Sequence, residues 1–149
     1  MKKYLFLLLT VCVFSACSEK SKVNSKDKKI PVEIKFLRFD KDFVETPASN
    51  FQDLKLKYPF LLPSNVSDET WFEKRNDTLF KEVYSEVQLN FKDTEQLEND
   101  LKSLFQHIKF YFPKQNPGKV VTLISDMDLD AKTIYTDSLA IISLDTYLG

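Results

Sequence analysis

This sequence has little glycine, cysteine or histidine, and each shortage excludes a class of chemistry. Only two of its 149 residues are glycine. A Rossmann fingerprint or a P-loop needs several glycines so that the backbone can approach phosphate closely, which excludes nucleotide enzymes of both classes. The single histidine, His107, belongs to no HExxH motif and has no cysteine cluster to join it. We therefore expect no zinc site built from this chain and interpret His107 as a residue beside a helix-packing surface.

The two cysteines, Cys12 and Cys17, both lie near the N-terminus. Two lysines precede an apolar run over residues 4–14, and Ser15-Ala16 leads from that run to Cys17. This is the layout of a bacterial lipoprotein signal, in which the cysteine thiol receives diacylglycerol and the preceding peptide is removed. The run is shorter than the ~20 residues of a membrane-spanning helix. We predict a signal peptide over residues 1–16 and lipidation of Cys17; the alternative is a plain secretory signal with a chance cysteine.

Residues 17–30 are predicted to be a lipidated cysteine and a flexible, lysine-rich tether. The lysines could contact anionic headgroups, each contributing ~1 kcal/mol, or the segment could be only a solvated spacer.

Removal of residues 1–16 from 149 leaves 133 residues, which suits one domain over residues 31–149. A net charge of −1 gives no electrostatic footprint for nucleic acid. Because both cysteines are used or removed, stability must come from packing, for which 13 Phe, 6 Tyr and one Trp are available.

The first half of the domain is predicted to be mainly helical. After a strand over residues 32–39 and a partly helical stretch to Tyr58, Ser67 is placed to cap a long helix that runs to Phe91. A second helix is predicted from Asp93 to Phe112, and we expect the two to form an antiparallel hairpin. The apolar stripes comprise Phe72, Leu79, Phe80, Val83, Tyr84, Val87 and Phe91 on the first helix, and Leu97, Leu101, Leu104, Phe105, Ile108 and Phe112 on the second.

The second half changes to strand-like patterns over residues 119–124, 133–136 and 139–144. Helices followed by adjacent strands predict an α+β fold, with two long amphipathic helices packed on a small β-sheet. The last strand is apolar enough to expect cover on both faces, and only two long helices are available. We therefore expect an incomplete domain, the front part of a longer protein.

An acidic run is the one candidate metal site. Asp126, Asp128 and Asp130 alternate along the chain, and Asp137 follows eleven residues after Asp126, which partly matches a calcium-binding EF-hand loop. Ala131 stands where the sharp turn needs glycine, and Asp137 replaces the bidentate Glu. The alternative is a solvated loop that joins two strands.

The order of several motifs resembles the gliding motility lipoprotein GldB family of Bacteroidota. The lipoprotein signal is followed by a set of segments that together cover nearly the whole domain. They are Leu37-Arg38-Phe39-Asp40, Tyr58-Pro59-Phe60, Asn76-Asp77-Thr78-Leu79, the stretch 104–113, Ser125-Asp126-Met127-Asp128 and the final nine residues, 141–149.

This resemblance implies a lipid-anchored component of the cell envelope that acts in gliding and in the associated type IX secretion system, with no established enzymatic activity. We expect the protein to face the periplasm, because no acid-rich surface-export signal follows Cys17, and we expect no cofactor, nucleotide or nucleic acid. The expected partners are the membrane, through the lipid anchor, and other envelope proteins of gliding or secretion. Family members continue beyond the segment that ends at Gly149, so the resemblance also leaves an alternative. The chain could be the N-terminal part of a zinc-peptidase-like hydrolase domain whose active-site helix lies beyond it. A surface lipoprotein unrelated to gliding is the third interpretation.

Overall fold

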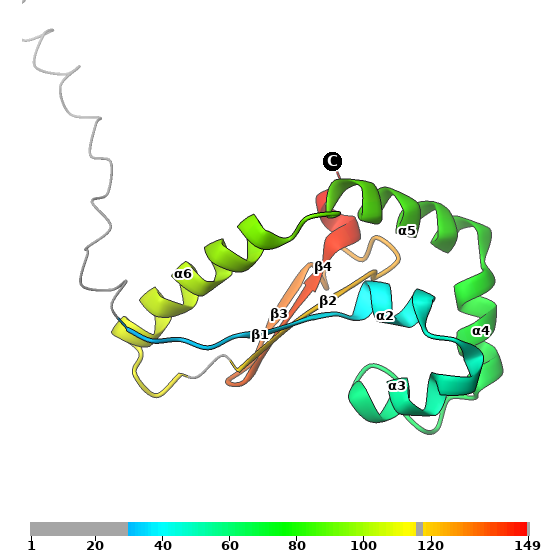
Figure 1. The fold of residues 1–149 in the computed structure, drawn as a ribbon, viewed down its shortest axis with the longest axis horizontal. Coiled ribbons are helices and arrows are strands. Elements are labelled where there is room, and N and C mark those ends of the chain that lie inside the picture. Colours follow the sequence, from blue (N-terminus) through cyan, green and yellow to red (C-terminus); the bar gives the residue numbers. More distant parts are fainter. Residues whose placement is uncertain (1–29, 116–117, 149) are drawn as a thin grey trace, which may run out of the picture.

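The computed structural model describes residues 30–115 and 118–148, and these form an α+β fold as predicted (Figure 1). The helices are α2 (Phe39–Glu45), α3 (Phe51–Lys57), α4 (Asp68–Asn76), α5 (Thr78–Asn90) and α6 (Glu95–Tyr111). Short 3-10 helices, η2 (Ala48–Asn50) and η3 (Leu144–Tyr147), precede α3 and follow the last strand. The strands are β1 (Lys35–Arg38), β2 (Lys119–Leu123), β3 (Thr133–Tyr135) and β4 (Leu139–Ser143).

The four strands form one sheet in the order β1-β2-β4-β3. β1, β2 and β4 are parallel, with Val121 of β2 beside Leu37 on one side and Ile141 on the other. β3 is the antiparallel edge strand next to β4. All of the helices except η3 lie in the connection between β1 and β2. Because β1, β2 and β4 are parallel, their carboxyl ends meet at one edge of the sheet.

The long helix predicted from Ser67 to Phe91 is two helices, and this prediction needs correction. Ser67 caps α4 as predicted, accepting a hydrogen bond from the Thr70 amide at 3.3 Å. The chain then turns at Asp77, whose backbone is extended (φ −60°, ψ 138°). Asp77 Oδ1 accepts a hydrogen bond from the Phe80 amide at 2.8 Å. A short acidic side chain that satisfies a free amide favours a new helix start over continuation of the old helix.

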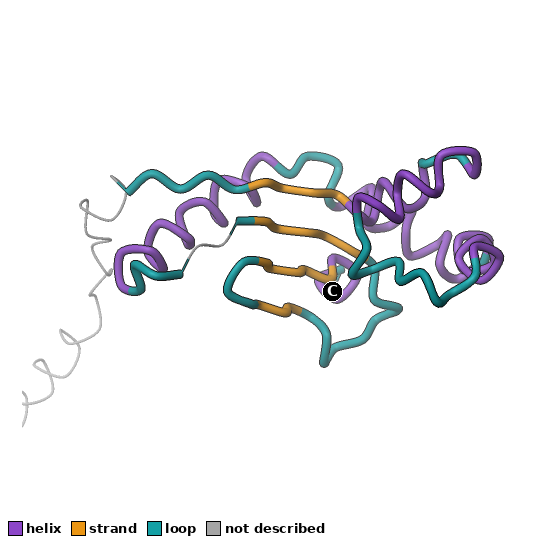
Figure 2. Tube along the Cα trace, turned by 90° about the horizontal axis from the view of Figure 1, so that it is seen from below, coloured by secondary structure: helices purple, strands orange, loops and turns teal. Residues whose placement is uncertain are grey.

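The helix α6 agrees with its prediction, but its relation to α5 does not. Asp93 Oδ1 accepts a hydrogen bond from the Glu95 amide at 2.8 Å, and Pro113 follows the last turn. Figures 1 and 2 show α5 and α6 following one another over the sheet as an arch, where we expected an antiparallel hairpin. Phe105 of α6 packs on Tyr135 of the sheet, whereas Phe80 of α5 packs on Phe43 of α2, so the two helices do not have to cover one another.

The two faces of the sheet are covered unequally. On one face α6 packs on the edge strand, where the rings of Phe105 and Tyr135 stack at 6.3 Å, and Arg38 reaches the end of α5. Figure 2 shows the other face with no described helix in front of it. There Ile134 is 44% exposed and Ile141 is half-buried. The expectation of cover on both faces is therefore met on one face only by the described residues.

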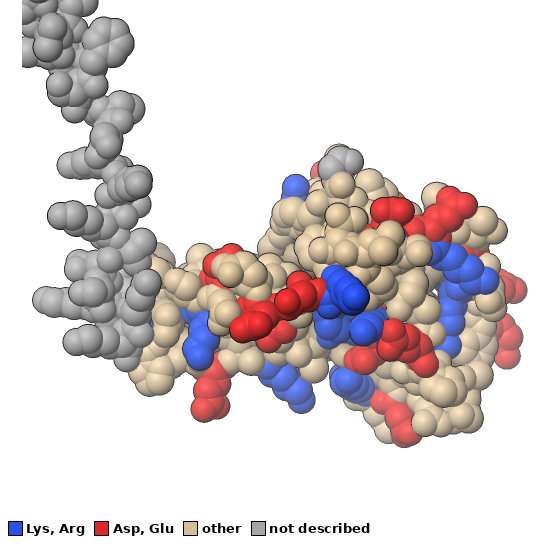
Figure 3. Space-filling model, turned by 45° about the horizontal axis from the view of Figure 1, so that its top comes forward, with Lys and Arg blue, Asp and Glu red and all other residues tan. Residues whose placement is uncertain are grey.

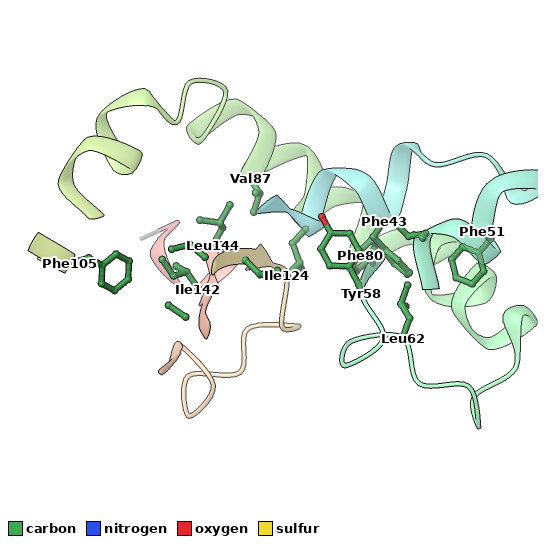
Figure 4. Close-up of a cluster of buried hydrophobic side chains, with 14 of the residues drawn as sticks. Phe43, Phe51, Tyr58, Leu62, Phe80, Val87, Phe105, Ile124, Ile142 and Leu144 are labelled. Carbon is green, nitrogen blue, oxygen red and sulfur yellow. The ribbon is translucent and has the colours of Figure 1, made fainter. Parts of the chain in front are cut away.

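The densest part of the core lies beyond the carboxyl ends of the strands, among α2, α3, α4 and α5 (Figure 4). Phe43 makes edge-to-face contacts with Trp71 and Phe80, with ring centroids at 6.1 and 5.8 Å. The Arg75 guanidinium lies 5.2–5.4 Å from the ring centroids of Phe43, Phe51 and a third ring, Phe72. Burial lowers the Arg75 pKa from its ordinary value. This end of the molecule is thus held by aromatic packing around one cation.

Three residues of the predicted apolar stripes are exposed: Leu79 by 66%, Leu104 by 51% and Phe112 by 63%. Leu79 lies in the first turn of α5, directly after the break at Asp77 that the single-helix prediction missed. Phe112 follows the last residue of α6, beyond the edge of the sheet. The periodicity therefore identified the helical faces but overestimated their burial, both at the helix ends and at Leu104 within α6.

Candidate functional site

A cavity of about 300 Å³ lies next to the carboxyl edge of the parallel strands, where ligands commonly bind in open sheets. It is open on the less covered side of the sheet, between the strands and helices α2, α4 and α5. Most of its lining is apolar, and the apolar residues are Phe39, Phe43, Leu61, Trp71, Phe80, Leu123, Ile124, Ala131, Ile134 and Ile141. Such a wall favours an apolar group over a charged one.

A buried carboxylate, Asp40, stands at one side of this cavity with its side chain fully inaccessible. Arg38 donates hydrogen bonds to both of its carboxylate oxygens: Nε lies 3.0 Å from Oδ1 and Nη2 lies 2.7 Å from Oδ2. Gln88 Nε2 donates to Oδ2 at 3.0 Å, and the Thr122 hydroxyl donates to Oδ1. Burial alone would raise the Asp40 pKa, but these hydrogen bonds and the charge of Arg38 hold it below its ordinary value. Asp40 therefore remains an anion that joins β1, β2 and α5.

A second buried carboxylate, Asp145, follows β4 and holds the loop after β2. It accepts hydrogen bonds from the Ser125 amide at 3.1 Å and from the Met127 amide at 2.6 Å, and also from the Ser125 hydroxyl. Asp126 and Met127 both have left-handed backbones, with φ of 60° and 62°. Non-glycine residues occupy this region at a cost, so the Asp145 carboxylate fixes a loop that is unfavourable by itself.

The rim of the cavity is polar. Lys74 of α4 forms an ion pair with Asp126 across the opening. Trp71 lines the cavity, and its buried Nε1 has no hydrogen-bond acceptor among the described residues. A buried indole N–H normally finds an acceptor. The cavity thus offers an apolar space, and Asp40, the buried carboxylate in its lining, is already occupied by bonds within the fold.

Each residue predicted as a site from the sequence can now be placed. Cys17 lies outside the described residues. The aspartates of the calcium candidate are used separately: Asp126 pairs with Lys74, Asp128 accepts from the Asp130 amide at 3.0 Å, and Asp137 accepts from Gln115 Nε2 at 3.4 Å. Within residues 30–115 and 118–148, no group of three or more His, Cys, Asp or Glu could hold a metal ion.

His107 lies half-buried on α6, where its Nδ1 is 2.6 Å from the Ser103 carbonyl oxygen. Its place beside the packed face of the helix agrees with the interpretation given to it from the sequence.

The sequence analysis missed Asp40 and Asp145 as site residues. Each directly follows a strand-like segment, and this was the available signal. A carboxylate there can meet residues from neighbouring strands because parallel strands end at one edge. In a chain in which 22 residues are Asp or Glu, that position alone did not distinguish them.

The fold and the site together define an α+β protein with a mainly parallel sheet and an apolar cavity at its carboxyl edge. The family model described as gliding motility protein GldB matches residues 20–149, and the chain belongs to this family. Neither the comparison with curated proteins nor that with solved structures gave a match. In the part of the chain described by the structure, no helix is long and apolar enough to cross a bilayer.

Proposed function

We propose that this protein is a lipid-anchored, non-enzymatic component of the cell envelope that acts in gliding motility and the associated type IX secretion machinery. The membership in the GldB family supports the motility role. The lipoprotein signal that ends at Cys17 supports the anchor. The protein would face the periplasm and act by binding other envelope proteins.

The observation that favours binding over catalysis is the state of the two buried carboxylates. Asp40 is neutralised by Arg38 and receives two further hydrogen bonds, while Asp145 receives two backbone amides and a hydroxyl. A general acid or base needs a lone pair or proton that faces a substrate, whereas these two carboxylates are hydrogen-bonded to other groups of the protein. They serve to shape the cavity.

The cavity suits an apolar side chain from a partner protein, which its apolar lining would bury. The Lys74–Asp126 pair lies at the rim, where it would contact a polar part of the same partner. Anchoring residues of protein interfaces commonly combine such an apolar pocket with a polar surround.

The anchor is tested by Cys17→Ala in the full chain. We expect the variant to leave the membrane fraction and to lack the added mass of the lipid, while Ser18→Ala, a matched neighbour, remains bound and lipidated. Persistence of Cys17→Ala in the membrane fraction would contradict the anchor.

The docking role is tested by filling the cavity with Ala131→Phe. Ala131 lines the cavity, and its hydrogen bonds are made by the backbone: the carbonyl accepts from the Ser143 hydroxyl at 2.7 Å and the amide donates to Asp128 Oδ1 at 3.4 Å. We expect loss of colony spreading and of secretion with normal protein level and membrane attachment. Ala48→Phe, at an exposed position of η2, is the matched control and should behave like the unaltered protein. Normal spreading with the cavity filled would rule out this docking site.

A further inference from the structure

The C-terminal end of α6 exposes three consecutive aromatic residues. Phe110 is 38% exposed, and Tyr111 and Phe112 are each 63% exposed. The first two rings contact each other edge to face at 5.0 Å. We name Phe110–Phe112 the aromatic turn. Most other exposed apolar residues, such as Leu56 and Leu89, occur singly, which is normal for a protein surface, and Ile134 and Tyr135 form an exposed pair. A run of three large rings is a patch that signals contact with a partner surface.

The aromatic turn lies at the end of the molecule where the chain from Cys17 enters. Gln106 Nε2 of α6 donates a hydrogen bond to the Ile30 carbonyl at 3.1 Å, and Figure 1 shows the described chain beginning beside the end of α6. Twelve residues separate Cys17 from Ile30, and the chain between the two spans at most about 45 Å. A lipid on Cys17 therefore keeps this end of the domain close to the bilayer.

The charges near the aromatic turn favour an anionic lipid surface. Lys109 and Lys114 flank it, and Lys35 and Lys119 begin the paired strands β1 and β2 at the same end. The acidic residues Glu33 and Asp137 also lie at this end, and Asp137 is bonded to Gln115. Glu98 and Lys102 of α6 lie in the same hollow as Glu33. Figure 3 shows both signs of charge over the face that it draws. Aromatic rings with neighbouring lysines are the combination that binds at the headgroup level of membranes.

We propose that the aromatic turn rests in the headgroup region of the bilayer to which Cys17 is anchored. This inference rests on the proposed lipidation of Cys17. The parallel strands run from this end toward the cavity at their carboxyl edge. Contact at the aromatic turn would therefore hold the cavity on the side of the molecule away from the membrane, where a protein partner can reach it.

The scarcity of cysteine makes a direct test possible. In the processed, lipidated protein no thiol remains, because Cys12 is removed and Cys17 is alkylated. One introduced cysteine can then carry a fluorescent label: Lys114→Cys beside the aromatic turn, or Leu56→Cys on α3, where Leu56 is 80% exposed at the other end of the molecule. The labelled proteins are reconstituted in phosphatidylcholine–phosphatidylglycerol vesicles that contain a lipid with a nitroxide headgroup.

We expect the nitroxide to quench the label at position 114 at least about twofold more than the label at position 56, because rings inserted at the interface lie within about 10 Å of the headgroups. Adding Tyr111→Ser and Phe112→Ser should remove the difference. The matched control pair Leu79→Ser and Leu89→Ser, at exposed positions of α5, should preserve it.

Equal quenching at positions 114 and 56 in lipidated, vesicle-bound protein would overturn the inference and leave the anchor intact. Protection of position 114 from aqueous iodide without quenching by the lipid would also overturn it, in favour of contact with a second copy. Protein that lacks the lipid mass and does not sediment with vesicles would overturn the anchor and, with it, the inference.

Discussion

The two ends of the sheet contain aromatic side chains in opposite states of burial. At the carboxyl end, Phe51 is 1% and Phe80 is 6% exposed, within a cluster formed by α2 to α5. At the amino end, Tyr111 and Phe112 are each 63% exposed, although they follow an equally regular helix. The exposure of the rings differs because different numbers of helices pack around them at the two ends. Four helices converge at the carboxyl end, whereas α6 reaches the amino end alone (Figure 1).

This contrast teaches that an aromatic residue stabilises a fold only where the topology brings other elements to it. Burial of a large ring contributes through removal of apolar area from water, and a ring left exposed contributes little. Rings that are exposed together at one end are instead available for another surface. The predictions below test whether the carboxyl end supplies stability and the amino end supplies contact.

The largest effect is expected from Asp40→Ala. Removal of one partner of a buried ion pair leaves the Arg38 charge uncompensated, so we expect the free energy of unfolding to fall by about 4 kcal/mol. Asp137→Ala, at the exposed amino end, should leave it unchanged. Chemical denaturation followed by circular dichroism measures both. Equal stability of the two variants would show that the Arg38–Asp40 pair does not stabilise the fold.

The same carboxylate predicts how stability depends on pH. The pKa of Asp40 is lower in the fold than its ordinary value, so the unfolded chain binds its proton first as the pH falls. The contribution of Asp40 is therefore complete above pH ~4 and is lost as the pH falls through the folded pKa. We expect the difference in free energy of unfolding between Asp40→Ala and the unaltered protein to shrink in this acidic range. A difference that stays constant with pH would contradict a lowered pKa for Asp40.

The next effect compares two phenylalanines. Phe80→Ala should lower the free energy of unfolding by about 3 kcal/mol because it removes a buried ring that packs on Phe43. Phe112→Ala removes a ring that is mostly exposed and should change stability by less than about 0.5 kcal/mol. Thermal and chemical unfolding of the pair provide the measurement. A costly Phe112→Ala would mean that the aromatic turn belongs to the core.

Arg75→Ala is expected to cost about 2 kcal/mol. The substitution removes cation–π contacts with Phe43, Phe51 and Phe72, and also the hydrogen bond from Nη1 to the Thr46 carbonyl at 2.8 Å. Lys102→Ala, on the exposed side of α6, is the control and should be neutral. Arg75→Lys should recover only part of the loss, because ammonium lacks the planar face that stacks between rings.

The smallest effect is a gain. Met127 has φ of 62°, a region that glycine occupies without penalty, so Met127→Gly should stabilise the fold by about 1 kcal/mol. Leu129→Gly, in the same loop but without a positive φ, should give no gain. A loss with Met127→Gly would mean that the methionine side chain contributes contacts that outweigh the backbone strain.

Local structure was largely predictable from the sequence. Short-range patterns predicted the strands at residues 119, 133 and 139, the cap at Ser67 and the approximate start of α6, whose N-cap is Thr94 and not Asp93. These patterns are β-branched runs, turn residues and side chains that accept free amides. The break at Asp77 was missed, although an aspartate can cap a helix, because the apolar period continued across it.

The candidate site could not be predicted in the same way. Asp40 and Asp145 are separated from their partners Thr122 and Ser125 by long stretches of chain, and only the parallel pairing of the strands unites them. The acidic run from Asp126 suggested a calcium loop, yet the fold directs Asp126 to Lys74 on a helix that is distant in sequence.

The class of the fold, the family and the expected anchor at Cys17 can be inferred from the chain alone, because each depends on residues that are neighbours along it. Which aromatic residues are buried, and which carboxylates are bonded within the fold, follows from the three-dimensional packing. It also decided on which side of the sheet the cavity opens. These outcomes depend on which elements meet in space, and that is fixed by the joint packing of helices and strands rather than by any one segment.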